Sequence, residues 1–548
     1  MSETPESPIE IIKRGSHHLR GTLAEELASP EPGFTADSQQ LLKPHGLYQQ
    51  KNRDKTDPGN KGPVLMLRGR IPGGRLSAAQ YLAYDALADS HGDGSLRLTT
   101  RQSIELHGVL KGNVKEVLQG IQKVLLTTQG ACGDVVRNVT QAPNPWDRAD
   151  IAQLDPLADR LSRHFLATSN AYTEIWLDGE RVNPDEEREP IYGQLYLPRK
   201  FKICLTVTGE NLVDLYTNDL GLAATFSAGV LDGFFVFAGG GMGMTHNDAT
   251  TFPRLADPLG WIPVAGLIPL AEAVVGVHRD FGHRAERRHA RLKYVVQEKG
   301  LDWFRGEIET RTGLRFEARE LPPWNTTSVL GWLPREGGSW AYGLHTPSGR
   351  VAGALKQALR ALVAEHALPV QVSPDQDLIL LDIPDQARAA IEARLAQARA
   401  KDPDPLERRA LACVALPLCG LAITEAERAL PDLLSPLRQA LVKHGRLAQA
   451  PVFRVTGCAN GCARPYSAEL ALVGQAVGKY ALYAGGSAQG DRLAVEIRQK
   501  LSTAELPELF DRLIGLWAAQ GLPSEPFGDF ANRLGASALA ASLQEASL

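Results

Sequence analysis

The chain has 548 residues, of which 43% are hydrophobic and 22% are charged, an ordinary composition for a globular protein of two to four domains. Its 59 basic and 63 acidic residues leave a net charge of −4, which argues against nucleic acid or a membrane as a partner. The N-terminus has no basic segment followed by an apolar stretch, so no signal peptide is predicted. We expect a soluble, cytoplasmic protein whose thiols stay reduced.

The first 60 residues are polar and are predicted to form an N-terminal arm. Two further linkers are predicted from proline-rich composition. They are "ELPPWN" at 320–325 and "KDPDP" at 401–405.

Two pairs of segments resemble each other in the same order along the chain. Residues 73–108 and 348–383 each begin near a Gly-Arg pair, continue as an amphipathic helix pattern, and end in a strand that carries a glutamine, Gln102 or Gln376. Residues 233–243 resemble 480–490. Such patterns also recur by chance in proteins that mix helices and strands, but the matched order favours an internal duplication in a mixed α/β or α+β fold.

Polar residues alternate along "RLTTRQSIELHG", residues 97–108, which is predicted to be one strand. One face would carry Arg97, Thr99, Arg101, Ser103, Glu105 and His107, and the other Leu98, Thr100, Gln102, Ile104 and Leu106. The polar face is either exposed to solvent or the wall of a site for a large anion.

Basic residues gather on three other segments. Arg68 and Arg70 are two positions apart, Arg137 precedes Asn138, and "LPRKFK" supplies Arg199, Lys200 and Lys202. If these segments converge, they form a cationic site in a nearly neutral protein. The loop "GGGMG" at 239–243 matches neither a P-loop nor a dinucleotide fingerprint, so no NADPH or flavin site is predicted in this chain.

The most apolar long segment, residues 260–277, is interrupted by Pro263, Pro269 and Glu272. It barely reaches the length that spans a bilayer, and we interpret it as buried core.

Four of the six cysteines lie within one window, as the pairs Cys413/Cys419 and Cys458/Cys462. In a reducing compartment this clustering favours a metal site over disulfides. Four thiolates suit zinc or an iron–sulfur cluster, and the Cys-x5-Cys and Cys-x3-Cys spacings favour the cluster. A helix is predicted after Gly420, which would place Cys419 near a helix N-terminus where a thiolate is stabilised. Cys132 and Cys204 are interpreted as small buried hydrophobic residues.

At this point the chain resembles the sirohaem-containing sulfite and nitrite reductases, and within them most closely the haemoprotein (beta) subunits of assimilatory sulfite reductases. The most specific match is the signature that runs from Thr456 and Gly457 through Cys458 and Cys462 to Glu469. The stretches "RLTTRQ", "RNV", "LPRKFK" and "ACVALPLCGLA" match other landmarks of the family.

The resemblance implies two cofactors, a [4Fe–4S] cluster and sirohaem. Cys413, Cys419, Cys458 and Cys462 would hold the cluster, and Cys462 would also bridge to the sirohaem iron. Sirohaem carries many carboxylates, and the residues implied to contact it are Arg97, Arg101, His107, Arg199, Asn460 and Gln376. Glu105 stands where close relatives have glutamine, and Asp375 and Asp377 flank Gln376 where relatives often have asparagine.

The implied reaction is the six-electron reduction of sulfite to sulfide, with Arg68, Arg137, Lys200 and Lys202 around the bound anion. Nitrite is the alternative substrate. Electrons would come from a partner, an NADPH-oxidising flavoprotein or, alternatively, ferredoxin. A zinc-stabilised binding protein is the alternative from another class, and the absence of net positive charge argues against a role on DNA.

The implied fold is a duplicated α+β arrangement, in which two ferredoxin-like lobes pair and each is followed by a larger α/β domain. The predicted boundaries are 1–60 for the arm, 61–130 for the first lobe, 131–330 for the first larger domain, 331–405 for the second lobe and 406–548 for the domain with the cluster.

Overall fold

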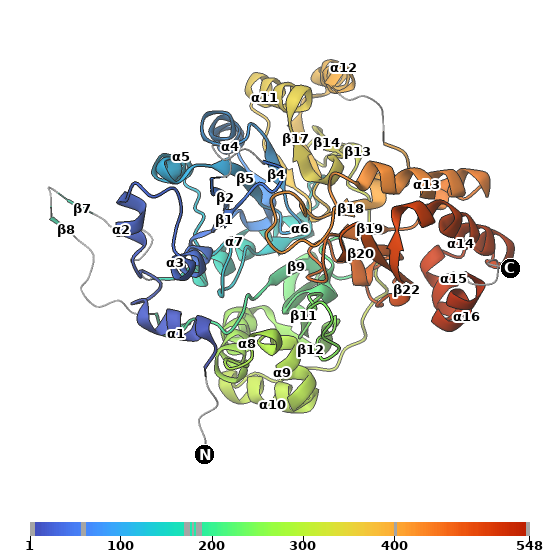
Figure 1. The fold of residues 1–548 in the computed structure, drawn as a ribbon. Coiled ribbons are helices and arrows are strands. Elements are labelled where there is room, and N and C mark those ends of the chain that lie inside the picture. The colour runs from blue at the N-terminus through green and yellow to red at the C-terminus, as the bar shows by residue number, and fades with distance from the viewer. Residues whose placement is uncertain are drawn as a thin grey trace.

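The computed structural model of the chain describes residues 6–55, 62–168, 176–177, 180–181, 189–398 and 403–543. Four five-stranded sheets carry most of the fold, and a small pair of strands, β7 (Trp176–Leu177) and β8 (Glu180–Arg181), stands apart from them. In Figure 1 the blue and yellow lobes lie at the top, the first larger unit in green at the bottom, and the second in orange and red at the right.

The two lobes have matching sheets. The first sheet has the order β1-β2-β5-β4-β15, and the second has the order β13-β14-β17-β16-β3. The strands of the first are β1 (Leu47–Gln50), β2 (Val64–Arg68), β4 (Leu96–Leu98), β5 (Ile104–Val109) and β15 (Arg350–Val351). Those of the second are β13 (Gly331–Pro334), β14 (Trp340–Leu344), β16 (Val370–Val372), β17 (Leu378–Ile383) and β3 (Arg75–Leu76).

The lobes exchange a strand with each other. By sequence β3 belongs to the first lobe, yet it pairs with β16 of the second, while β15 pairs with β4 of the first. The helices α4 (Ala78–His91) and α5 (Val114–Lys123) belong to the first lobe, and α11 (Gly353–His366) and α12 (Arg388–Ala398) to the second. Apolar residues of both lobes form one buried cluster, so the two lobes share a core.

The two larger units repeat a second pattern. Their sheets have the orders β12-β11-β10-β9-β6 and β18-β19-β20-β21-β22, and in each the first three strands in the chain run parallel. The first unit contains β6 (Thr140–Gln141), β9 (Ile203–Val207), β10 (Leu220–Ser227), β11 (Val230–Ala238), β12 (Asp257–Pro263), α6 (Ala149–Ala152), α7 (Asp155–His164), α8 (Leu267–Phe281), α9 (Leu292–Lys299) and α10 (Leu301–Thr312). The second contains β18 (Ala410–Ala412), β19 (Phe453–Thr456), β20 (Leu470–Ala476), β21 (Lys479–Ala484), β22 (Val495–Ser502), α13 (Leu430–Lys443), α14 (Leu506–Gln520), α15 (Phe527–Leu534) and α16 (Ala536–Ser542).

The repeat extends to single hydrogen bonds. The Lys202 amide donates to the Asp219 carboxylate at 3.0 Å, and the Val452 amide donates to the Glu469 carboxylate at 2.8 Å. Both acids are buried and directly precede the central strand of their sheet. The duplicated, mixed helix-and-sheet fold predicted from the repeats is therefore confirmed, while the domain boundaries stay a prediction.

The N-terminal arm is packed against the body of the molecule. It forms α1 (Pro8–Gly15), α2 (Leu23–Ala28) and α3 (Ala36–Leu41). The buried Lys13 ammonium donates to the Leu197 carbonyl at 2.9 Å, and Arg284 pairs with buried Glu10 at 2.5 Å. The end of the arm, 56–60, and residues 401–402 of the predicted second linker lie outside the described residues.

The apolar segment 260–277 forms the end of β12 and most of α8, and α8 is largely buried in the core of the first larger unit. This confirms its interpretation as core. Among the described residues, no helix is long and apolar enough to cross a membrane.

Candidate cofactor and anion site

The segment 97–108 is a hairpin, and the prediction of one continuous strand is wrong. The strand β4 ends at Leu98, β5 begins at Ile104, and Gln102 between them has a positive φ of 51°. Leu98, Ile104 and Leu106 face the shared core, as predicted for the apolar side. Pairing across the hairpin places Arg97 opposite Glu105, so the two main charges of the polar side come from adjacent strands.

A row of charges crosses this sheet. Glu105 is paired in register with Arg68 of β2 on one side and with Arg97 of β4 on the other. Arg68 Nε donates to the Glu105 carboxylate at 2.8 Å, and His107 Nε2 lies 3.2 Å from its second oxygen. Burial works to raise the pKa of Glu105, but the charge of Arg68 and the hydrogen bond from His107 hold it well below its ordinary value. Glu105 is therefore an ionised, paired carboxylate.

Arg97 connects the first lobe to the strand that precedes the first cysteine pair. Its guanidinium donates to the Ala412 carbonyl at 3.0 Å and lies 3.1 Å from Glu427. Gln376, in the amide orientation that satisfies both groups, accepts from Arg97 at 3.2 Å and donates to Ala412 at 3.3 Å. Two residues predicted to contact sirohaem thus meet beside Cys413.

Arg101 extends from the hairpin turn towards the first larger unit. It donates to the Asn218 side chain at 2.6 Å and to the Ile203 carbonyl at 2.8 Å. Asn138 returns the contact by donating to the Arg101 carbonyl at 2.8 Å. The neighbouring Arg70 is held among the Gly130 and Val136 carbonyls and Ser162, so we assign it a structural role.

The four clustered cysteines lie on two loops of the second larger unit. The Gly457 amide donates to the Cys413 sulfur at 3.4 Å, and the Asn460 side chain donates to the Cys458 sulfur at 3.4 Å. A Cβ on Gly457 would lie 2.5 Å from the Thr424 carbonyl and 2.7 Å from Ala415, so only glycine allows the two loops to approach this closely.

The predicted helix directly after Gly420 is wrong. Residues 421–428 are irregular, and α13 begins only at Leu430. The amides of Ile423 and Thr424 instead donate to the Gly457 carbonyl, at 2.8 and 3.1 Å. Cys419 therefore lies in an irregular loop and not at a helix N-terminus.

The chemistry of this donor set fits an iron–sulfur cluster. Burial raises the pKa of Cys413, Cys419 and Cys458, that of Cys458 to about 11, and the neighbouring Cys462 raises all three further. The four thiols are thus electrostatic neighbours that a bound metal cluster would hold as thiolates. Within the described ranges, no three His, Cys, Asp or Glu side chains are placed to hold a single metal ion.

A group of cations faces the exposed Cys462. Lys200 and Lys202 are half-buried, and neither ammonium group donates to an acceptor in the part of the chain that is described. Burial and the adjacent Arg199 lower the pKa of Lys200 to about 7, while Cys462 acts in the opposite direction. Burial and Lys200 lower that of Lys202 well below its ordinary value. Half-buried ammonium groups that bond to no acceptor among the described residues fit an anionic cofactor and an anionic substrate.

The other predicted cations surround this group. Arg199 lies 4.0 Å from Asp134, and burial together with Arg287 lowers its pKa to about 10. Arg137 donates to the Gly133 carbonyl at 2.8 Å and is close enough to Lys200 to affect its charge. The structure thus brings Arg137, Arg199, Lys200 and Lys202 together, while Arg68, Arg97 and His107 line the hairpin side.

Sequence reasoning missed Asp219 and Arg291. Arg291 is held by Asp219 at 2.9 Å and adds a positive charge beside Lys200 and Lys202. Glu469, the last residue of the signature, is the repeat equivalent of Asp219. The internal repeat therefore contained the signal that would have identified Asp219.

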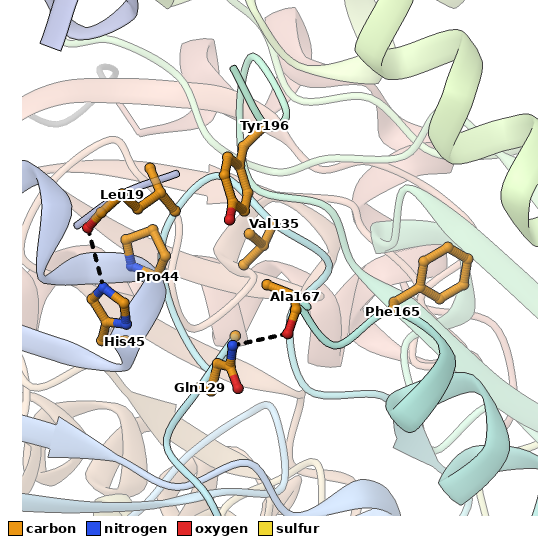
Figure 2. A pocket seen from close by; sticks show the side chains of 9 residues that line it. Leu19, Pro44, His45, Gln129, Val135, Phe165, Ala167 and Tyr196 are labelled. Atoms are coloured by element: carbon orange, nitrogen blue, oxygen red, sulfur yellow. Dashed lines mark hydrogen bonds between the residues drawn. The ribbon is translucent and has the colours of Figure 1, made fainter. Parts of the chain in front are cut away.

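The pocket shown in Figure 2 is separate from this site. It lies between the N-terminal arm, which supplies Leu19, Pro44 and His45, and side chains of the first larger unit that include Phe165 and Tyr196. None of the predicted cofactor or substrate residues lines it. Cys132 and Cys204 are both fully buried, as predicted, and they lie close enough to Arg68 and Arg101, respectively, to act on their charges.

Comparison with known proteins gives two family matches. Residues 158–316 match the nitrite and sulphite reductase 4Fe-4S domain, and residues 57–124 and 333–398 match the nitrite/sulfite reductase ferredoxin-like half domain. The first match falls on the first of the two repeated larger units, whereas the four clustered cysteines lie in the second.

Curated relatives cover nearly the whole chain. A "Sulfite reductase [NADPH] hemoprotein beta-component" of Myxococcus xanthus is 43% identical over 97% of both chains. A protein of the same name from Xylella fastidiosa is 42% identical over 97% of both chains. A "Sulfite reductase [ferredoxin]" of Synechococcus elongatus is 42% identical over 97% of this chain and 90% of its own.

A solved structure shares the fold. The Mycobacterium tuberculosis NirA protein superposes with a TM-score of 0.81 and 23% sequence identity, over 98% of each chain.

Proposed function

The chain belongs to the nitrite and sulphite reductase family, and we propose that it is the haemoprotein subunit of an assimilatory sulfite reductase. The observation that carries this proposal is the pair of half-buried lysines, Lys200 and Lys202. Their ammonium groups bond to no acceptor within the described ranges, and Lys200 lies close enough to Cys462 for the two charges to interact. A cationic wall next to four clustered thiols suits reduction of a small oxyanion by an iron–sulfur cluster joined to a haem.

Two cofactors follow from the family and from the donor set. Cys413, Cys419, Cys458 and Cys462 would hold a [4Fe–4S] cluster, with Cys462 shared with sirohaem. The sirohaem carboxylates would pair with Arg97, Arg101, His107, Arg199, Asn460 and Gln376. When bound, these groups would relay the electrons of the donor and supply the redox chemistry of the reduction.

The remaining cations bind the substrate. Arg68, Arg137, Lys200 and Lys202 would hold the sulfite oxygens, and Glu105 fixes the position of Arg68 by its hydrogen bond. Six electrons and six protons convert hydrogensulfite into hydrosulfide and three waters, so the site must also deliver protons. The half-buried Lys200 ammonium, which lies close to Cys462, is suited to donate one of them and to be recharged from solvent.

The electron donor is a second protein. No dinucleotide or flavin fingerprint is present in the sequence, and relatives at similar identity carry either NADPH or ferredoxin in their names. We propose an NADPH-oxidising flavoprotein because that name recurs among the most similar relatives, with ferredoxin as the alternative. A cytoplasmic location is part of the same proposal.

The test is sulfide formation by the purified holoprotein, first with reduced methyl viologen and then with each natural class of donor. We expect one sulfide for every six electrons, and sulfite-dependent NADPH oxidation when the flavoprotein is added. Turnover with ferredoxin alone would replace the proposed donor. A higher kcat/KM for nitrite than for sulfite would replace the proposed substrate, and no product with any donor would contradict the assignment.

A further inference from the structure

A short segment of the N-terminal arm crosses the loop that carries the first cysteine pair. The backbone amide of Arg53 donates to the Pro417 carbonyl at 3.3 Å. Its guanidinium donates to the Ala422 carbonyl through both terminal nitrogens, each at 3.1 Å, and to the Cys419 carbonyl. One residue from the arm thus binds three carbonyls of the 413–422 loop.

The same segment is fixed at a second point. Asp54 pairs with Arg428, and Arg428 also pairs with Glu425. The outer side of the 413–422 loop is otherwise open, because Gly420 is exposed and Leu421 is 70% exposed. Arg53 therefore ties the arm to the exposed outer side of the 413–422 loop.

The positive charge of Arg53 also lies beside Cys419, because its guanidinium donates to the Cys419 carbonyl. A cation at this position offsets part of the negative charge of a thiolate-ligated cluster and favours its reduced form.

We propose that Arg53 is a positioning residue that holds the 413–422 loop closed over the iron–sulfur cluster. This inference rests on the cofactor assignment in the proposed function. It gives the N-terminal arm a role in the redox centre, although the arm contributes none of the four cysteine ligands.

The test compares Arg53→Met and Arg53→Lys with Arg428→Met in the complete, cofactor-loaded protein. Arg428→Met is the matched control, because it removes one exposed positive charge and the second anchor of the same segment but leaves all three Arg53 contacts to the loop carbonyls in place. Two quantities are measured: the rate at which an iron chelator removes the cluster, and the midpoint potential of the cluster by redox titration monitored by electron paramagnetic resonance.

We expect at least tenfold faster iron release from Arg53→Met than from Arg428→Met, together with a more negative potential. Arg53→Lys should keep the potential close to that of the unaltered protein but release iron faster, because an ammonium group cannot bridge both carbonyls. Equal release rates for Arg53→Met, Arg428→Met and the unaltered protein would overturn the proposal. If the unaltered protein instead holds no iron and labile sulfide, the cofactor assignment itself fails.

Discussion

Glu105 places a buried negative charge among residues proposed to hold a cofactor rich in carboxylates. The structure gives that charge two partners, Arg68 and His107. Since the charge of Glu105 is already balanced by Arg68 and His107, the carboxylate need not repel the cofactor. Replacement of Glu105 by glutamine, its neutral isostere, should also be accepted.

We predict that Glu105→Gln retains sirohaem at the level of the unaltered protein. The glutamine can still accept from Arg68, and the loss of one negative charge favours anion binding. The haem content is measured from the Soret absorption, and the sulfite KM is measured alongside it. Loss of sirohaem in this variant would contradict the assigned role of Glu105.

Lys200 gives a prediction on pH that can be made for the cofactor-free protein. Its pKa is lowered to about 7 in the folded chain, so between pH 7 and its ordinary value the unfolded chain binds a proton that the folded chain lacks. The destabilisation by Lys200 is therefore complete below pH 7 and decreases as the pH rises. Thiols whose pKa is raised, such as that of Cys458, lower the stability of the fold at higher pH. The unaltered protein is therefore compared with Lys200→Met, because both contain the same thiols.

We predict that Lys200→Met is more stable than the unaltered cofactor-free protein at pH 7. The difference in the free energy of unfolding should shrink by about 1.5 kcal/mol by about pH 8.5, because each proton contributes at most about 1.4 kcal/mol per pH unit. Chemical denaturation of both proteins at several pH values measures this difference in the free energy of unfolding. In the loaded enzyme the same variant should lower kcat/KM for sulfite about 100-fold. A stability difference that is independent of pH would show that Lys200 is not desolvated.

At the scale of elements, the two cysteine loops depend on a close contact that only glycine permits. We predict that Gly457→Ala loses most of its iron and labile sulfide, because its Cβ would meet the Thr424 carbonyl at 2.5 Å. The substitution should also destabilise the fold by about 1–3 kcal/mol. Chemical analysis of iron and labile sulfide, together with thermal unfolding, provides the measurement.

Gly420→Ala is the matched control for this prediction. Gly420 lies in the first cysteine loop, and a Cβ there would have no heavy atom within 4 Å. It should keep its cluster. Equal iron content in the two variants would contradict the packing argument.

The sequence predicted that the four cysteines form one site and that Leu98, Ile104 and Leu106 face the core. It predicted neither the turn at Gln102 nor the irregular segment after Gly420. Alternation of polar residues continues through Thr99, Arg101 and Ser103, and no glycine or proline marks the turn at Gln102. The residues after Gly420 have good helix propensity. They remain irregular because tertiary contacts outweigh that propensity: Glu427 binds Arg97 and Arg350, and Thr424 binds Gly457.

At the scale of the whole molecule, the internal sequence repeat predicted the duplicated architecture. The exchange of strands β3 and β15 between the two lobes could not be predicted from it. Matched offsets place Gln102 and Gln376 at equivalent turns, both with positive φ. The exchanged strands β3 and β15 are only two residues long, and each is defined by a partner in the other lobe. Their sequences carry no period that could reveal that partner.

An ion-pair network with a buried centre at Asp214 joins three parts of the molecule. Asp214 of the first larger unit binds Arg454 at 2.9 Å and Arg464 at 2.5 Å in the second, and Arg464 binds Asp375 of the second lobe at 2.8 Å. We predict that Asp214→Ala destabilises the protein by about 3–5 kcal/mol, because it leaves buried charge without its partner. Asp529→Ala, which removes a partly exposed partner of Arg492, should change stability by at most about 1 kcal/mol.

Chemical denaturation of the two variants measures both effects. Similar midpoints for Asp214→Ala and Asp529→Ala would show that the network does not hold the three parts together.

The central claim is that one set of four cysteines holds a cluster beside sirohaem. It is tested most directly by assaying iron, labile sulfide and extractable sirohaem in six single Cys→Ser variants. We predict cluster loss at Cys413, Cys419, Cys458 and Cys462, loss or displacement of the haem signal at Cys462, and full cofactor content at Cys132 and Cys204. Zinc in place of iron and sulfide, or retention of the cluster in any of the first four variants, would contradict the account.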